Sequence, residues 1–291
     1  MVAKSENILG SGSTGYVVAL DSTTVAKLGC WSDNQYFSDM IAEMMSTEEK
    51  IYQRLGPHPQ ICGYLGPVSG GFKLQRMEGT LRERLSKHEP LPKNLALKWS
   101  LQLAIGLAYI HSKGVLQSDF GCHNVLLDNE DNLKLCDFAG SSIDNEPAIV
   151  ESGDQFQKIF VNDLAAGSEL LCELFALGCA LYEIWTTNMP YENESKEYIE
   201  QMYQIRCFPN VEGLPPASII KRCWNRSYRN TDDVVKDLEY LASNETSRSI
   251  WPTIPRSISL ITLSCSMAFA CLMAHKSVRP GLLHLIKRFF Y

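Results

Sequence analysis

The feature that most constrains the fold of this chain is the order in which its short glycine-rich and charged motifs occur between residues 10 and 185. A glycine-rich loop comes first, and a lysine and a helical glutamate follow. An Asp-x-x-x-x-Asn segment then precedes an Asp-Phe pair and a long apolar helix. Each segment alone is weak, because short motifs are only hypotheses. Their joint order is what constrains the fold and its chemistry.

The glycine-rich segment runs from Gly10 to Val17 between stretches of β-forming residues. Tyr16–Leu20 and Thr23–Leu28 flank a turn at Asp21-Ser22, so the pattern predicts strand, glycine loop, strand, turn and strand. Glycines let a backbone approach phosphate oxygens closely and direct N–H groups at them. The loop by itself is also compatible with an ordinary Gly/Ser hairpin, but the strands around it favour a phosphate-binding interpretation.

Two long helices are predicted from the spacing of apolar residues. Asp39–Leu55 has apolar side chains near every 3.6 positions, and Glu48 lies on the inward stripe. Glu43 and Glu49 are the other glutamates that compete for an inward position, and Glu49 is the second choice. Asn94–Lys113 repeats the same spacing and is followed by a glycine that suits a helix C-cap.

The polar residues after the second helix are closely spaced. Asp119 and Asn124 keep an Asp-x-x-x-x-Asn pattern, and Leu133–Gly140 predicts a strand and a turn that carry Asp137. A strand-end aspartate beside a core phenylalanine is the structural alternative for Asp137. The segment Glu173–Trp185 then predicts a buried apolar helix.

Together these segments resemble the eukaryotic protein kinase family, and more loosely a divergent branch known mainly from fungi. The resemblance covers about Glu6 to Ala242. It implies a two-lobed α+β fold, with a small antiparallel β lobe carrying one helix over residues 1–78 and a mainly helical large lobe over residues 79–245. It also implies an ATP- and Mg²⁺-dependent enzyme that transfers the γ-phosphoryl group to a protein hydroxyl.

The resemblance assigns catalytic and metal-binding roles residue by residue. Lys27 would bind ATP phosphate oxygens and pair with a helical glutamate, for which Glu48 is the choice. Asp119 would accept the proton of the substrate hydroxyl. Asn124 and Asp137 would hold Mg²⁺.

The resemblance also implies a nucleotide site between the lobes. Gln75 and Met77 lie where the family's lobe-connecting hinge falls, and their backbone groups would meet the adenine. The full set of expected nucleotide-binding residues is Gly10, Gly12, Gly15, Val17, Val25, Lys27, Gln75 and Met77.

Several positions depart from the family pattern. Gln117 and Ser118 replace the histidine and arginine before the catalytic aspartate. Because the arginine normally pairs with a phosphorylated activation loop, that mode of control is expected to be absent. Gly121 stands where serine/threonine kinases have a lysine, and His123 stands where tyrosine kinases have an arginine. With Ala139 in place of the glycine after Asp-Phe, Gln117 and Gly121 favour the alternative of a pseudokinase that binds ATP or acts as a scaffold without turnover.

The apolar helix indicates the kind of substrate. Small-molecule kinases share Asp-x-x-x-x-Asn but usually lack the pattern of Glu173–Trp185, so a protein substrate is preferred, with Ser/Thr favoured over Tyr. Glu173 replaces the family's aspartate and is one methylene longer, which leaves its contact with the catalytic loop open.

Composition narrows the location and the partners. The net charge of −6 argues against a general nucleic-acid binder, and scattered cysteines without a C-x-x-C pair suit a cytoplasmic setting. Residues 246–291 have no Asp or Glu and carry six basic residues. Within them, residues 257–274 have no charged side chain and would span about 27 Å as a helix. We therefore expect membrane contact through residues 257–291; a tail helix packed on the large lobe is the alternative.

Overall fold

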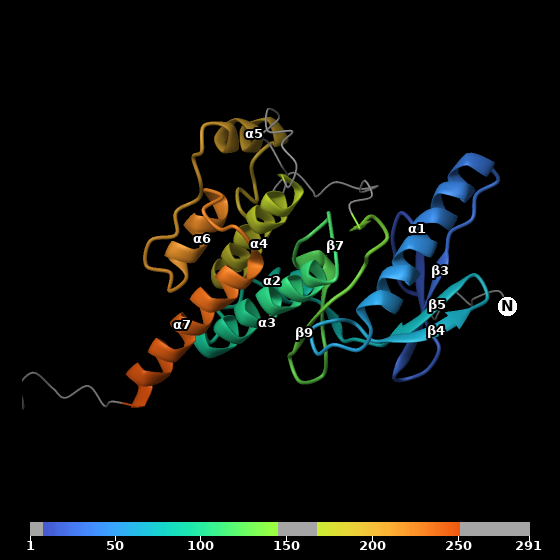
Figure 1. Cartoon of the computed structure of the whole chain (residues 1–291), viewed down its shortest axis with the longest axis horizontal. Helices are drawn as coiled ribbons and strands as arrows, with labels where there is room; N and C mark the ends of the chain where they lie inside the picture. The colour runs from blue at the N-terminus through green and yellow to red at the C-terminus, as the bar shows by residue number, and fades with distance from the viewer. Residues whose placement is uncertain (1–7, 145–167, 251–291) are drawn as a thin grey trace, which may run out of the picture. The chain divides into compact units, whose positions relative to one another are not determined.

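The computed structural model describes residues 8–144 and 168–250. Two compact units are distinguished, residues 1–242 and residues 243–291. The first unit contains an antiparallel sheet with one long helix and a larger group of helices (Figure 1). The expected α+β architecture with a small β lobe and a helical lobe is confirmed.

The sheet of the small lobe is antiparallel, with strand order β1-β2-β3-β5-β4. The turn between β2 and β3 is fixed by Asp21, whose Oδ1 accepts the backbone N–H of Thr23 at 2.7 Å. In the register of these strands Val17 lies opposite Lys27, which places the glycine loop beside the lysine. The strands are β1 Ile8–Ser11, β2 Gly15–Ala19, β3 Thr24–Gly29, β4 Tyr64–Val68 and β5 Gly71–Gln75.

Helix α1, Gln35–Leu55, lies beside the sheet (Figure 1). It starts before the predicted Asp39 because the side chain of Asn34 caps it by accepting the N–H of Tyr36. The first turn is exposed and so carries no apolar periodicity by which to predict it. Its buried face contains Ile41, Met44, Met45, Glu48, Ile51, Tyr52 and Leu55.

The large lobe is built around α3, Lys93–Ser112, and α4, Ser168–Thr186. Helix α3 matches the predicted segment to within one residue at each end, and Gly114 follows with a φ of 71°, a left-handed conformation that suits a glycine C-cap. On α4, a Cβ at Gly178 would lie 2.7 Å from Cys223, so this glycine permits close packing against α6. The other helices are α2 Leu81–Leu85, α5 Lys196–Gln204, α6 Ala217–Trp224 and α7 Thr231–Ile250.

Short strands carry the polar segments of the large lobe. Strand β8, Val125–Leu127, pairs with β9, Leu133–Leu135, as an antiparallel hairpin, and β6, Gly79–Thr80, adds to its edge. Strand β7, Val115–Leu116, pairs with β10, Ser142–Ile143. The 3₁₀ turn η2, Cys122–Asn124, precedes β8. These pairings hold the two ends of the segment 117–124, which carries Asp119 and Asn124.

The predicted membrane segment at residues 257–274 falls in the part of the chain that the structure does not describe. Within residues 8–144 and 168–250, no helix combines the length and apolar character needed to cross a membrane.

Candidate active site

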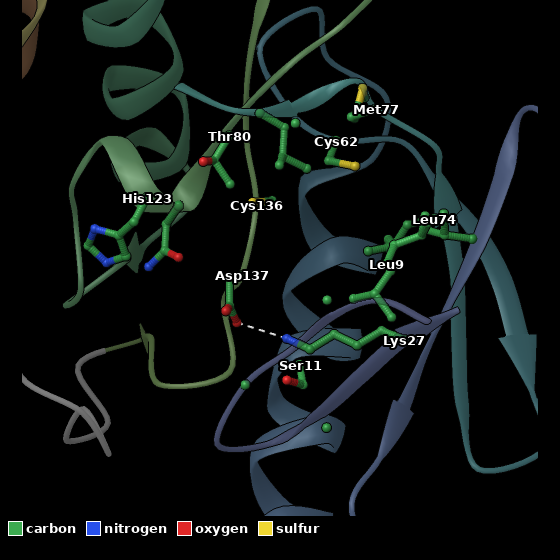
Figure 2. A pocket seen from close by; sticks show the side chains of 18 of the residues that line it. Leu9, Ser11, Lys27, Cys62, Leu74, Met77, Thr80, His123, Cys136 and Asp137 are labelled. Carbon is green, nitrogen blue, oxygen red and sulfur yellow. Dashed lines mark hydrogen bonds and ion pairs between the residues drawn. The ribbon is translucent and has the colours of Figure 1, made fainter. Parts of the chain in front are cut away.

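A cavity of about 350 Å³ lies between the glycine loop, β3, β5, α2 and the β8–β9 hairpin. Figure 2 shows Asp137 turned toward Lys27 across this cavity, with His123 on the side of the large lobe. All the expected nucleotide- and metal-binding residues line it, together with Glu48. Asp119 is not among the lining residues. The lining also includes residues outside the expected nucleotide- and metal-binding set, namely Leu9, Ser11, Thr14, Cys62, Leu74, Gly79, Thr80, Glu83, His123, Leu126 and Cys136.

Lys27 is held by two carboxylates at the base of the cavity. Its Nζ lies 2.6 Å from Oε2 of Glu48 and 2.8 Å from Oδ1 of Asp137. Glu48 is fully buried, and Lys27 is nearly so at 7% exposure. Glu49, the second choice from the sequence, instead accepts the hydroxyl of Tyr64 at 2.6 Å. The structure thus brings together three predicted residues that lie on β3, on α1 and after β9.

Burial and ion pairing act in opposite directions on these groups. Burial lowers the pKa of Lys27, but the carboxylates of Glu48 and Asp137 outweigh it and raise that pKa above its usual value. Burial raises the pKa of Asp137, but the Lys27 ammonium outweighs it and the net pKa is lowered. For Glu48, complete burial dominates and the pKa is raised despite Lys27. The Lys27 ammonium therefore offsets the repulsion between the neighbouring carboxylates of Glu48 and Asp137.

The segment 117–124 brings Asp119 and Asn124 into direct contact. The Nδ2 of Asn124 donates to the backbone carbonyl of Asp119 at 2.9 Å and to Asp119 Oδ2 at 3.2 Å. Since the amide nitrogen is used in this way, the amide oxygen of Asn124 is the atom suited to a metal ion. Asn124 is buried, whereas the side chain of Asp119 is 30% exposed, as a group that must reach a substrate would be.

Two residues of this site have left-handed backbone conformations that are unusual for non-glycine residues. Ser118 has φ 65° and Asp137 has φ 57°, and such residues cost about 1–2 kcal/mol each. The N–H of Ser118 donates to Glu173 Oε1 at 2.6 Å. The Nε2 of Gln117 donates to the carbonyl of Cys136 at 2.7 Å. These buried side chains therefore hold the backbone at Ser118 and immediately before Asp137.

Glu173 is itself held in place despite its extra methylene. Its Oε2 lies 2.5 Å from Nε2 of His111, and the other ring nitrogen of His111 lies 2.7 Å from Oγ1 of Thr231. The longer side chain thus reaches the backbone of Ser118 from α4 while contacting α3. The sequence left open whether Glu173 contacts the loop that carries Ser118, and the structure shows that it does.

Phe138 fixes the segment that begins at Asp137. Its ring packs edge-on against Tyr52 of α1, with centroids 5.1 Å apart. Its backbone N–H donates to Glu48 Oε1 at 3.3 Å. Both rings are buried, so α1 and the Asp137 segment are packed together as one unit beside the cavity.

The glycines of the loop are not equivalent. A Cβ on Gly15 would lie 2.1 Å from the carbonyl oxygen of Leu28, so this glycine is required by the close approach of β2 and β3. A Cβ on Gly10 or Gly12 would meet nothing within 4 Å. Protein packing therefore gives no reason for glycine at positions 10 and 12, where both residues face the cavity.

At the hinge, neighbouring backbone N–H groups are already hydrogen-bonded. Gln75 donates to Gly63, Arg76 donates to Thr23, and Glu78 donates to Leu127. Met77 lies between them and lines the cavity together with Gln75. The hinge is thus anchored on both sides of the residue expected to meet the adenine.

A protein kinase domain model matches residues 3–256 of the chain. The chain therefore belongs to the protein kinase family, as the sequence resemblance indicated. The match extends past residue 245, where the large lobe was expected to end.

Individual relatives are distant. A mitogen-activated protein kinase kinase kinase of Arabidopsis thaliana is 27% identical over 163 residues, which are 53% of this chain and 24% of that protein. A mitogen-activated protein kinase of Aspergillus terreus is 26% identical over 205 residues, 68% of this chain and 53% of that protein. A probable serine/threonine-protein kinase of Dictyostelium discoideum is 29% identical over 189 residues, 62% of this chain and 36% of that protein. The chain spans less than two thirds of the length of these relatives.

Proposed function

We propose that this protein kinase transfers the γ-phosphoryl group of ATP to hydroxyl groups of a protein substrate, with serine or threonine preferred to tyrosine. The observation that carries the proposal is the buried Lys27 held between Glu48 and Asp137 at 2.6 and 2.8 Å. A lysine in this position offers a fixed positive charge to nucleotide phosphates inside the cavity. The likeness to a probable serine/threonine-protein kinase supports the preferred acceptor.

The groups facing the cavity suit Mg²⁺ as well as ATP. The carboxylate of Asp137 and the amide oxygen of Asn124 are hard oxygen donors of the kind this ion prefers. When bound with ATP, Mg²⁺ neutralises phosphate charge as the group is transferred. Lys27 would orient the phosphates, and Asp119 would accept the hydroxyl proton of the substrate.

The second candidate is a pseudokinase that binds ATP without turnover. Gly121 favours it, because no side chain there supplies the positive charge that serine/threonine kinases place near the γ-phosphate. Among the described residues that line the cavity, Lys27 and His123 are the basic ones, and the ammonium of Lys27 is already bound by two carboxylates. A site this poor in positive charge could bind ATP and yet stabilise the transferred group weakly.

A phosphotransfer assay separates the two candidates. Purified full-length protein is incubated with radiolabelled ATP and a generic protein substrate, with and without Mg²⁺, and nucleotide binding is measured by thermal shift in the same preparation. The kinase proposal expects Mg²⁺-dependent labelling of the substrate. A Mg·ATP-induced shift without labelling would establish the pseudokinase instead.

A further inference from the structure

His123 lies beside the proposed catalytic base. Its Nε2 is 3.2 Å from Oδ2 of Asp119, and the two residues are at positions i and i+4. The Nδ2 of Asn124 donates to the same oxygen at 3.2 Å. Oδ2 of Asp119 therefore meets two nitrogen atoms, and neither of these contacts involves Oδ1.

The backbone that carries His123 is fixed on both sides. Cys122 and Asn124, its neighbours on η2, are buried. The N–H of Asn124 donates to Gly121, and its carbonyl accepts the N–H of Cys136, each at 3.0 Å. The imidazole of His123 is only 36% exposed. The ring is thus presented to Asp119 from a turn that packing holds in place.

The contact requires a particular tautomer but no positive charge. A carboxylate oxygen accepts a hydrogen bond, so Asp119 selects the imidazole form that carries its proton on Nε2. That N–H remains a donor whether or not Nδ1 is also protonated. The orienting contact is therefore available to a neutral histidine.

His123 also occupies a boundary of the site. It lines the nucleotide cavity on the side of the large lobe (Figure 2), whereas Asp119 lies outside the lining. A carboxylate that serves as a general base must be held within hydrogen-bond reach of the proton it removes. If one oxygen of a carboxylate is fixed by hydrogen bonds, its other oxygen keeps one direction, and the substrate hydroxyl can meet it there.

We propose that His123 is a positioning residue that binds Oδ2 of Asp119 and so keeps Oδ1 directed at the hydroxyl of the protein substrate. Asn124 shares the same oxygen, so the two nitrogens act together. The inference rests on the proposed function, because it assigns His123 a role in that reaction. The aligned position carries arginine in tyrosine kinases, whereas the contact seen here needs only one N–H donor.

The test compares two substitutions of the same residue. His123→Leu removes the donor and keeps a side chain of comparable bulk, whereas His123→Gln places an amide N–H at a similar reach. We expect the leucine variant to lower kcat roughly tenfold with little change in KM for ATP, because an interaction that serves the chemical step appears in kcat. The glutamine variant should recover most of that loss. Both variants should keep the thermal shift induced by Mg·ATP, which reports an intact fold and nucleotide site.

Each other result overturns the inference. An unchanged kcat in His123→Leu would show that the contact is dispensable. Equal losses in the leucine and glutamine variants would assign the role to charge rather than to the hydrogen bond. A rise in KM for ATP that matches the loss of activity would place His123 in nucleotide binding. A wild-type protein without turnover would remove the proposed function and this inference with it, whereas an active wild type with unaffected variants removes the inference alone.

Discussion

The two sides of the cavity that contains Lys27 and Asp137 differ in how closely they keep the kinase pattern. On the small-lobe side, Lys27 and Glu48 are retained, buried and paired at 2.6 Å. On the large-lobe side, Gln117, Ser118 and Gly121 all replace the usual residues of the catalytic loop. The overall arrangement of the loop nevertheless persists through hydrogen bonds to its backbone.

The contrast follows from the kinds of interaction on each side. Losing one member of a buried ion pair leaves an uncompensated charge, which costs several kcal/mol. A hydrogen bond to a backbone carbonyl can be supplied by different side chains, as the Nε2 of Gln117 does for Cys136. Likewise, Glu173 reaches the N–H of Ser118 although it is longer than the usual aspartate. Substitution is therefore tolerated where hydrogen bonds position the backbone, and resisted where buried charges balance.

Lys27→Met should remove the buried ion pair on the small-lobe side and give the largest loss of stability. It leaves Glu48 buried without its cation, so we expect a loss of about 3 kcal/mol in the free energy of unfolding and no thermal shift with Mg·ATP. Lys50→Met is the matched control, because Lys50 is exposed on the same helix that carries Glu48. Urea denaturation of both variants measures the difference. Equal stability of the two variants would contradict the account.

The loss of stability caused by Lys27→Met should depend on pH. Burial raises the pKa of Glu48, and without the ammonium nothing in this ion pair opposes that rise. A carboxyl whose pKa is higher in the folded state binds a proton on folding, so folding becomes less favourable as pH rises through that pKa. The stability gap between wild type and Lys27→Met should therefore narrow when urea denaturation is repeated at pH 6 instead of pH 8. A gap that widens at lower pH would mean that Glu48 does not govern the loss.

The two kinds of loop glycine sharpen the comparison within the small lobe. Gly15→Ala should lose about 1–3 kcal/mol of stability from overpacking, because its Cβ would meet the backbone of Leu28 at 2.1 Å. Gly12→Ala should keep the unfolding midpoint of the wild type and bind ATP roughly tenfold more weakly, equal to about 1.4 kcal/mol. Thermal denaturation with and without nucleotide gives both quantities. The proposed phosphate contact fails if Gly12→Ala binds ATP normally.

On the large-lobe side, Ser118 replaces the arginine that pairs with a phosphorylated activation loop. The rate of phosphotransfer should therefore not depend on phosphorylation of that loop. Ser118 cannot pair with a phosphate as arginine does. Arg54 of α1 instead lies 2.5 Å from Oδ1 of Asp144, close to the β7–β10 pairing. We expect enzyme treated with phosphatase to keep its rate, as measured by phosphotransfer before and after treatment. A large loss of rate would show that another cation responds to a phosphorylated loop.

The sequence was sufficient for those parts of the site that depend on local periodicity or spacing. The inward stripe of α1 distinguishes Glu48 from Glu49, because one helical face meets the sheet. The Asp-x-x-x-x-Asn spacing singled out Asp119 and Asn124, although their contact depends on the turn η2. In contrast, Cys62 and Leu126 line the cavity only because distant segments converge there.

Some of the missed residues carried partial signals. Thr80 and Glu83 form a capping box at the start of α2, and the T-x-x-E spacing is visible in the sequence. That signal locates a helix start and says nothing about a cavity. The contact between His123 and Asp119 needs the 3₁₀ geometry of η2, which no periodicity predicts. The pairing of Glu173 with His111 likewise depends on how α3 and α4 pack.

The smallest expected effect on catalysis concerns the tail. We propose that residues 257–291 attach the kinase to a membrane, because residues 257–274 carry no charge and basic residues follow. If residues 257–274 formed a helix, it would be about 27 Å long, which is marginal for a hydrocarbon core of about 30 Å. A spanning tail should resist carbonate extraction, and a surface-bound tail should be released by it. Soluble, monomeric full-length protein that is unaffected by deletion of residues 250–291 would refute both forms.

The most direct test of the central claim is to substitute the proposed general base and the proposed metal-binding aspartate separately and to measure ATP binding and phosphotransfer together. Asp119→Asn and Asp137→Asn are compared with wild-type protein by Mg·ATP-induced thermal shift and by radiolabel transfer to a protein substrate. The account predicts that Asp119→Asn keeps the shift but loses about 100- to 10,000-fold in rate, the usual contribution of a general base. It predicts that Asp137→Asn loses both the Mg²⁺-dependent shift and the transfer. Turnover that survives in Asp119→Asn, or an ATP shift that is the same in Asp137→Asn and in wild type with or without Mg²⁺, would contradict the assignment of the site.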